Sequence, residues 1–596
     1  RQYEEHAVTA PMSEHGDLLQ YFKRELSYLR DQGADFAHRY PRVASRLALH
    51  GAESLDPHTE HLIESVAFLT ARVHRDLDQQ FPSIASALLD NLCPSLVQPI
   101  PSMSVSHFVL DPSQGKVTAG FDVPRHTIVR AQTKQGQECR FRTAWDTVLW
   151  PIEVIRAEID VDAMLRLTLQ CSPDTDFSEL EVDDLRIHLH GDWMTTMPLY
   201  DALIAGVQSV SLVPEGCNKI SLPKNAWREV GYDEQHEVLP QPVNAQHAYG
   251  LLQEYFAFPR KFHFFDLCKL RGQLGRGQRC DVVFQLDGPS RSLRNIGAEN
   301  FQLGCTPIIN LFPRTSEPIV MDDSHYEFLL APDQQGDGFT EVHSIVSVVA
   351  SDPNAEKAVT VPDFSGLGHV DGSTDTVFWT SRREHSLRRN ISGTDVFLSF
   401  VDQNKNLKST VQPVVYAHLL CTNRRMAEQV PVGARLVAEG PPQPTHVRCL
   451  YEPTAQRDPP LGAETLWRLV SLMTLNHQSL VDGSTGRKQL REMLTLFASE
   501  NRQDYAQIRG IDSLSARSVT AHVGNQAWRG FCRGTEVSLE FDEDAFVGGS
   551  SLLMSAVLAR FFAMYTSVNS FVQLAVRHGD EVRKRWDPMT GRQVVL

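Results

Sequence analysis

The stretch EYFAFPRKFHFFDL at Glu254–Leu267 has six aromatic side chains in fourteen residues, whereas the whole chain is 8% aromatic. Four of its phenylalanines are separated by even numbers of residues, which is typical of a strand with one buried face. These four are Phe256, Phe258, Phe262 and Phe264. Pro259 interrupts the run, so the pattern predicts an edge strand or two short strands.

A structural strand and a nucleic-acid surface are both compatible with this stretch. In the first case Phe256 and Phe264 belong to the core, and Arg260, Lys261 and His263 lie on the solvent side. In the second case the rings stack on bases and the basic residues neutralise phosphates. We favour the structural strand, because a chain with net charge −16 repels phosphate overall. No nucleic-acid partner is therefore expected.

Length and composition indicate a multidomain protein of the reducing cytoplasm. The chain has 596 residues, more than one hydrophobic core usually holds, with 42% hydrophobic and 22% charged residues. No apolar run approaches the length of a transmembrane helix and no secretory signal is visible, so no membrane insertion is expected. Ten cysteines lie far apart without a CxxC pair, which is typical of free thiols. Residues 1–11, which precede Met12, are expected to be an added leader or an upstream extension.

Changes of hydrophobic period along the chain predict an α+β protein of several domains. The predicted parts are a helical N-terminal region at 12–100, a β-rich middle domain at 101–330, a second β-rich domain at 331–437, a proline-rich linker at 438–463 and a small α+β C-terminal domain at 464–596.

The N-terminal region contains a clear helix start at Asp56–Pro57. The helix that follows has an apolar stripe at intervals of four or three residues. Its members are Leu62, Val66, Leu69, Val73 and Leu77. We expect this helix to end at Phe81–Pro82 and a short helix to follow at about Ser83–Leu92.

The strongest helix signal of the C-terminal domain covers Ser550–Asn569. Its apolar side chains form two faces, and such a helix is usually buried against two elements. The first face, Leu553, Val557, Phe561, Met564 and Val568, can be buried by the C-terminal domain itself. The second face is Leu552, Ala556 and Phe562. It is expected to be buried either by another part of this chain or by another subunit.

Patterns of catalytic and metal-binding residues are weak. The thiols of Cys268, Cys280 and Cys305 lack the short spacing of zinc ligands, and buried free cysteines are the favoured interpretation, with their role open. Carboxylates at Asp322–Asp323 and Asp542–Asp544 could hold a divalent cation in a hydrolase, but their surroundings favour solvated loops. We therefore expect no catalytic residue, no metal, no cofactor and no enzymatic activity.

Two further motifs are incomplete. Gly272–Gly277 has the sequence GQLGRG and lacks the lysine and hydroxyl residue of a phosphate-binding loop, which favours a turn. His236–Glu237 lacks the second histidine of a zinc-protease helix. Neither motif indicates a site.

Several longer strings, in the same order along the chain, closely resemble the TssF family, also called ImpG or VasA. They are YFKRELSYLRDQGADFAHRYPRVASRL at 21–47, PIPSM at Pro99–Met103, EYFAFPRKFHFFDL at Glu254–Leu267 with CTPIINLFP after it, CTNRRM at Cys421–Met426, WRLVSLMTLNHQSL at Trp467–Leu480 and ARFFAMYTSVNSFVQL at Ala559–Leu574. The resemblance extends from about Leu18 to the end of the chain.

The resemblance implies a structural baseplate component of the bacterial type VI secretion system, similar to a phage-tail baseplate wedge protein. In that family two TssF copies combine with one TssG, and the wedge includes TssE and the adaptor TssK. Six wedges surround the VgrG spike at the base of the contractile sheath. The resemblance thus implies a cytoplasmic location, at a baseplate docked on the inner-membrane complex.

Overall fold

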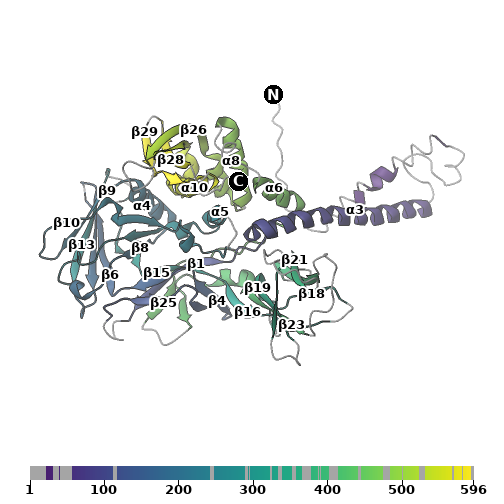
Figure 1. Cartoon of the computed structure of the whole chain (residues 1–596), viewed down its shortest axis with the longest axis horizontal. Helices are drawn as coiled ribbons and strands as arrows, with labels where there is room; N and C mark the ends of the chain where they lie inside the picture. The colour runs from purple at the N-terminus through teal and green to yellow at the C-terminus, as the bar shows by residue number, and fades with distance from the viewer. Residues whose placement is uncertain are drawn as a thin grey trace. The chain divides into compact units, whose positions relative to one another are not determined.

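We describe the protein from a computed structural model, shown in Figure 1. The description covers residues 22–23, 25–30, 39–40, 57–111, 117–160, 162–241, 247–288, 293, 295–321, 325–332, 338–351, 358–364, 377–386, 388, 391–401, 414–439, 445–473, 483–499, 501–522, 531–566, 570–579 and 581–591.

The chain consists of two compact units. The first is Arg1–Leu89 with Leu461–Val470, and the second is Asp90–Pro460 with Ser471–Leu596.

The first unit is helical where it is described. Helix α3 (Pro57–Leu92) has 36 residues, and α6 (Ala463–Met473) lies mostly in the same unit. The start of α3 at Pro57 agrees with the predicted start signal. Its predicted end at Phe81–Pro82 is wrong, because the helix continues through Pro82 to Leu92. Residues 22–23 and 25–30 are also helical, and the rest of the predicted N-terminal helical region before Pro57 lies outside the described residues, apart from 39–40.

A closed barrel forms the middle of the second unit. Its strand order is β1 (Met103–Leu110), β15 (Cys305–Ile309), β4 (Glu138–Thr143), β3 (Ile128–Gln132), β24 (Arg435–Ala438) and β25 (Thr445–Cys449). Alternate residues point inward, so Phe108, Val129, Phe141, Ile308 and Val447 fill the barrel. Beside it, β2 (Phe121–Val123) pairs with β5 (Thr147–Leu149).

The second unit contains two further antiparallel sheets next to the barrel. One has the order β10 (Ile220–Ser221), β9 (Val207–Pro214), β13 (Arg279–Leu286), β7 (Met164–Cys171) and β6 (Ile152–Ile159). The other has the order β11 (Trp227–Val230), β12 (Phe264–Leu267), β8 (Leu185–Leu189) and β14 (Phe301–Leu303). Helix α4 (Trp193–Ala205) contacts β8 and β9. Helix α5 (His247–Ala257) contacts the short 3-10 helix η6 (Pro259–Phe262) that leads into β12.

A two-sheet sandwich is inserted between β15 and β24. The first sheet has the order β16 (Phe312–Thr315), β23 (Val414–Thr422), β19 (Glu341–Ser351) and β20 (Val359–Val361), with β17 (Ile319–Val320) also on β23. The second has the order β18 (Glu327–Leu329), β22 (Thr394–Val401) and β21 (Phe378–His385). Side chains of both sheets, including Val348, Leu398, Phe400 and Leu419, share one core.

The C-terminal part combines one sheet with helices on it, as the predicted α+β pattern indicates. The sheet order is β26 (Ile511–His522), β27 (Phe531–Phe541), β28 (Phe571–His578) and β29 (Glu581–Arg585), and β30 (Met589–Thr590) also pairs with β28. The helices are α8 (Gly483–Phe497), α9 (Arg502–Arg509) and α10 (Ser551–Tyr565). Helix α8 contacts β26, and α10 contacts β28. Among the described residues, none of the helices is both long and apolar enough to span a membrane.

Strand pairing differs from the predicted domain boundaries at two places. β16, from the predicted 101–330 domain, pairs with β23, from the predicted 331–437 domain. β25 lies inside the predicted linker 438–463 but pairs with both β1 and β24 in the barrel. The prolines around Thr445 are typical of a linker. The pairing with β1 could not be seen in the sequence near Thr445, because β1 lies more than 300 residues earlier in the chain.

Candidate functional site

The aromatic stretch Glu254–Leu267 is not a strand over its whole length. Its first part belongs to α5, Pro259 begins η6, and only Phe264–Leu267 is a strand. The prediction of a strand at Phe256 is therefore wrong. The even spacing of the rings arose by chance from two different elements, since Phe256 lies in the last turn of a helix that begins at His247, before this stretch.

All six rings of this stretch are buried, which contradicts the base-stacking alternative. Phe256 is 5% exposed and Phe264 is closed to solvent. Phe264 meets the indole of Trp145 edge-on with the ring centroids 5.0 Å apart. Phe265 stacks on Trp227 with centroids 4.8 Å apart. Through these rings, β12 and α5 pack against the barrel and the neighbouring sheet.

The basic residues of this stretch do not lie on a solvent-facing side as predicted. Lys261 is fully buried and forms an ion pair with Glu254, which is 1% exposed. The other carboxylate oxygen of Glu254 accepts hydrogen bonds from the backbone N–H groups of Val238 (2.6 Å) and Leu239 (2.8 Å). Burial with an opposite charge is the arrangement that a buried lysine requires. Spacing alone could not show it, because the turn at Phe258–Pro259 folds Lys261 back onto α5.

Arg260 is partly buried and His263 fully buried in the second unit. The guanidinium of Arg260 lies 3.7 Å from the ring centroid of Tyr451 and 4.1 Å from that of Trp193. His263 is fully buried, and burial lowers its pKa to about 3, so the ring is neutral at pH 7. Neither residue is available to bind phosphate.

Helix α10 has both apolar faces buried inside the chain. Ser550 caps it by accepting a hydrogen bond from the N–H of Leu553 at 2.9 Å. The side chains of Leu552, Ala556 and Phe562 are closed to solvent, and the helix contacts α4, α5 and β28. Arg560 on α10 pairs with Glu229 on β11 at 2.6 Å. None of the three residues of the second face is therefore exposed for another subunit. The predicted end of this helix, residues 567–569, lies outside the described residues.

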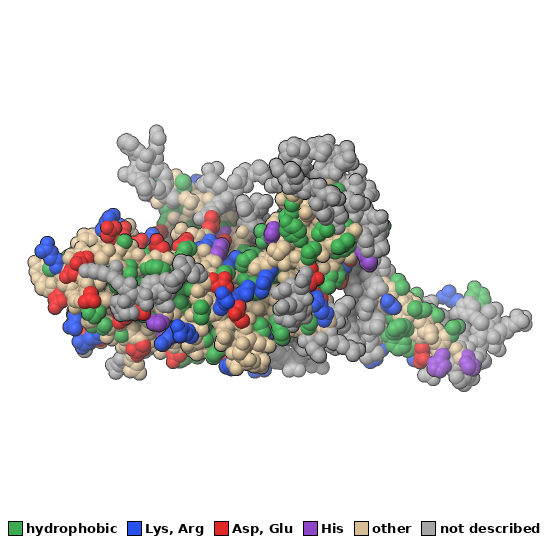
Figure 2. Space-filling view, turned by 90° about the horizontal axis from the view of Figure 1, so that it is seen from below, with side chains coloured by type: hydrophobic (Ala, Val, Ile, Leu, Met, Phe, Trp, Pro, Cys, Tyr) green, Lys and Arg blue, Asp and Glu red, His purple; other side chains and the backbone are tan. Residues whose placement is uncertain are grey.

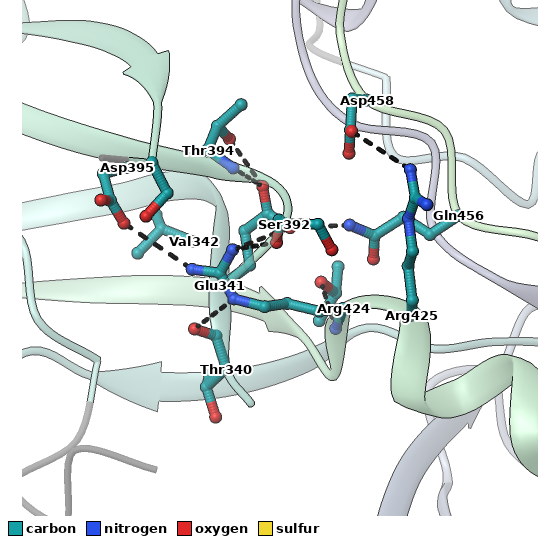
Figure 3. A network of polar contacts seen from close by, with 12 residues as sticks. Thr340, Glu341, Val342, Ser392, Thr394, Asp395, Arg424, Arg425, Gln456 and Asp458 are labelled. Atoms are coloured by element: carbon teal, nitrogen blue, oxygen red, sulfur yellow. Dashed lines mark hydrogen bonds and ion pairs between the residues drawn. The ribbon is translucent and has the colours of Figure 1, made fainter. Parts of the chain in front are cut away.

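A buried polar network joins the sandwich to the barrel (Figure 3). Glu341 of β19 accepts hydrogen bonds from the N–H (2.7 Å) and the hydroxyl (2.6 Å) of Thr394 on β22. Its other oxygen accepts one from the side-chain amide of Gln456 at 2.7 Å. Arg424 donates to the carbonyl of Ser392 at 2.7 Å and approaches Asp395 at 3.7 Å.

Arg424 begins the 3-10 helix η9 (Arg424–Gln429), whose Met426 and Ala427 belong to the barrel core. The residue has φ 51, a left-handed conformation that is costly for arginine and that the surrounding contacts maintain. Gly393 passes so close that a Cβ there would lie 2.5 Å from the Arg424 guanidinium. The string CTNRRM, which resembles the TssF family, thus contains Arg424, the residue that links the sandwich to the barrel. We did not predict this role of Arg424 from the sequence.

The weak chemical candidates do not converge on a site. Asp542 accepts a hydrogen bond from the N–H of Asp544 as the cap of the short helix η10 (Glu543–Phe546), and the three acidic residues are exposed. Glycines at 272, 275 and 277 have positive φ in a turn. Asp322–Asp323 lies outside the described residues. No group of three or more His, Cys, Asp or Glu side chains in the described part of the chain could hold a metal ion.

The three singled-out thiols are free and buried. Burial raises the pKa of Cys268 to about 11 and that of Cys280 to about 12, and it raises the pKa of Cys305 well above its ordinary value. Thiols in this state carry almost no thiolate at pH 7, so they behave as small apolar side chains.

The exposed apolar stripe of α3 is the best candidate for an interaction surface. Leu62, Val66, Leu69 and Val73 are 66%, 44%, 61% and 56% exposed. They follow one another at intervals of four, three and four residues and so lie on one side of the helix. Figure 2 shows hydrophobic side chains on this helix at the right of the view.

The opposite side of α3 is different. Ala67 and Ala71 are fully buried and lie on that side, at an interval of four residues. In the part of α3 that carries the stripe, small residues therefore occupy the covered side and large apolar ones the open side, whereas further along the helix Leu89 is buried. This distribution is the reverse of that of a helix which buries its large side chains in its own domain.

The family of the chain follows from its whole length. A family model described as "Type VI secretion system, TssF" matches residues 14–593. The chain belongs to the TssF family. It is 31% identical to the type VI secretion system component TssF1 of Pseudomonas aeruginosa over 611 aligned residues, which cover 96% of this chain and 98% of the relative. The family resemblance of the sequence strings is confirmed.

Two solved structures show the TssF fold. One is a chain of the TssK-TssF-TssG baseplate subcomplex of the type VI secretion system, with TM-score 0.72 and 21% identity over 90% of this chain and 99% of that chain. The other is a chain of the baseplate complex from the type VI secretion system, with TM-score 0.59 and 21% identity over 97% of this chain and all of that chain. TssF is a component of the type VI secretion baseplate.

Proposed function

We propose that this TssF chain is a structural wedge subunit of the type VI secretion baseplate. Two copies assemble with one TssG, and the wedge joins TssE and TssK around the VgrG spike to support the contractile sheath. The protein acts in the cytoplasm, where the baseplate docks on the inner-membrane complex. It has no enzymatic activity, nucleic-acid partner or cofactor.

The exposed stripe of α3 is the observation that carries the proposal. A helix of 36 residues is about 54 Å long, far more than one small domain needs. Apolar stripes of this kind on long helices are typically buried by helices of another chain. The proposal is also supported by the two similar structures, which are chains of a TssK-TssF-TssG baseplate subcomplex and of a type VI secretion baseplate complex.

The interior of the second unit supports a role in holding geometry. Its domains are joined by buried polar contacts, such as Glu341 with Gln456 at 2.7 Å. An aromatic layer around Phe264 joins the barrel to the next sheet. Such contacts resist changes of orientation between domains, and a subunit that transmits force needs this resistance.

Co-expression with the TssG protein of the same secretion cluster tests the proposal. Native mass measurement of the purified complex is expected to give two copies of this chain to one TssG. Addition of TssK should shift the whole complex to a higher mass. A stable complex with one copy of this chain, or no complex at all, would contradict the proposed assembly.

A further inference from the structure

Two exposed arginines face each other on the outside of the barrel. Arg435 of β24 and Arg448 of β25 are direct cross-strand partners. Their neighbours Leu436 and Val447 point into the barrel core, so both arginines point outward. On its other side Arg448 is the direct partner of His107 on β1. Arg435, Arg448 and His107 thus form one row across three adjacent strands, which we call the basic row.

Like charges directly opposite each other in an antiparallel sheet are destabilising. The same barrel shows how this repulsion is usually relieved. Arg130 of β3 is opposite Arg140 of β4, and these two are neutralised by Glu439, 2.7 Å from Arg130, and Glu138, 3.2 Å from Arg140. Arg435 and Arg448 have no such ion pair with any residue that the structure describes.

The charge of the basic row comes from the two arginines. Burial, followed by the nearby His190 and Arg448, lowers the pKa of His107 to about 4, so its ring is neutral at pH 7. The row therefore has two uncompensated positive charges on the surface of a chain whose net charge is −16. Such a local excess favours an anionic partner.

A pocket lined by polar and apolar side chains in about equal measure lies at the His107 end of the basic row. Its volume is about 270 Å³, and His107 itself is part of its lining. Val109, Trp150 and Leu303 form partly exposed apolar walls, above a floor that includes the buried Phe108 and Leu149. The polar side chains of Glu153 and Gln302 also line the pocket, so the carboxylates of a bound segment must lie on the arginine side. A pocket of this size accepts one large apolar side chain.

We propose that the basic row and this pocket bind an acidic segment of a partner protein. Carboxylates of the segment pair with Arg435 and Arg448, and one aromatic or aliphatic side chain enters the pocket beside His107. A polynucleotide fits less well, because the strongly acidic chain repels a long phosphate backbone and the two arginines neutralise few phosphates. The proposal goes beyond the wedge function and does not depend on it.

A fluorescein-labelled peptide with one tryptophan flanked by glutamates is the probe. Its binding to the full chain is measured by fluorescence anisotropy at low and high salt. The Arg435→Glu/Arg448→Glu variant is expected to bind at least about tenfold more weakly than the wild type. The control is Arg271→Glu/Arg276→Glu, which makes the same change of charge at two exposed arginines outside the basic row and the pocket lining. This control should stay within about twofold of the wild type.

Two further experiments test the role of the pocket and the preference for a peptide over a polyanion. Replacing the tryptophan of the probe by glycine should weaken binding several-fold if the pocket holds it. Heparin should compete poorly with the probe. The proposal is overturned by equal weakening in both double variants, by absence of binding to the wild type, or by heparin binding that depends on Arg435 and Arg448 while the peptide does not bind. Circular dichroism of each variant verifies that the barrel is folded.

Discussion

Glu254 and Lys261 form an ion pair in which the carboxylate is 1% exposed and the ammonium is closed to solvent. The pair connects the last turns of α5 to η6. Glu254 also accepts hydrogen bonds from the backbone N–H groups of Val238 and Leu239. A single carboxylate therefore organises three segments of the second unit. Removing either charge leaves the other buried without an opposite charge.

Lys261→Ala is expected to lower the free energy of unfolding by about 3–5 kcal/mol, the range for breaking a buried ion pair. Urea denaturation of the purified chain measures this loss. Lys219→Ala, at an exposed lysine, is the matched control and should change stability by less than about 0.5 kcal/mol. Equal stability of the two variants would show that Lys261 is neither buried nor paired in solution.

Ala556→Glu is expected to destabilise the chain even when no other subunit is present. Ala556 is closed to solvent between α10 and its neighbours in the same chain, and an unpaired carboxylate there costs several kcal/mol. The melting temperature of the isolated protein should fall strongly. Lys488→Glu, on the exposed side of α8, should leave it nearly unchanged. A normally melting Ala556→Glu protein would contradict the internal position of this helix face.

Asp201 gives a prediction for pH. Burial raises its pKa from 3.8 to about 6, although Ser550 and Arg583 donate hydrogen bonds to it. The folded state therefore binds this proton more tightly than the unfolded state does. Its contribution to stability is largest below about pH 4, decreases as the pH rises to about 6, and is constant above that.

Replacing Asp201 by Asn removes this titration. Between pH 6 and pH 4 the wild type should gain up to about 3 kcal/mol relative to Asp201→Asn, measured by urea unfolding at several pH values. Asp287→Asn, at an exposed aspartate, should follow the wild type across the same range. Parallel curves for the wild type and Asp201→Asn would show that Asp201 titrates at its ordinary pKa.

Sequence periodicity predicted helices whose period is contained in one continuous segment. The start of α3 at Pro57 and the helix α10 agree with the structure, because each of these helices shows its period in its own residues. It failed at α5, where the rings of a helix end and of a following strand happened to alternate. It also failed at β25, whose strand pairing, such as Cys449 with Ser106, joins residues far apart in the sequence.

The candidate surface shows a different limit of sequence analysis. Spacing alone identified the stripe with Leu62 and Leu69, but spacing does not tell whether a stripe is covered. The residues around Lys261 predicted a strand with this lysine on its solvent-facing side. In the structure Lys261 is buried, because the opposite charge of Glu254 makes its burial possible. Exposure and pairing depend on the tertiary structure, and short sequence windows do not contain it.

The stripe of α3 gives the prediction that bears most directly on assembly. Leu62→Glu/Leu69→Glu should leave the stability of the isolated chain within about 0.5 kcal/mol of the wild type, because both side chains are more than half exposed. The same variant should lose co-purification with TssG, since two charges would enter an apolar helix interface. Pull-down from co-expressing cells, with thermal melting of the free chain, measures both effects.

The matched control for this experiment is His61→Glu/Arg72→Glu. Both positions are exposed on α3 but lie beside the stripe and not within it. This control should retain TssG, because it adds charge to the same helix without changing the apolar surface. Full assembly of Leu62→Glu/Leu69→Glu would exclude the stripe as the interface. A strongly lowered melting temperature would instead show that the chain itself covers the stripe, because only a buried leucine is costly to replace by glutamate.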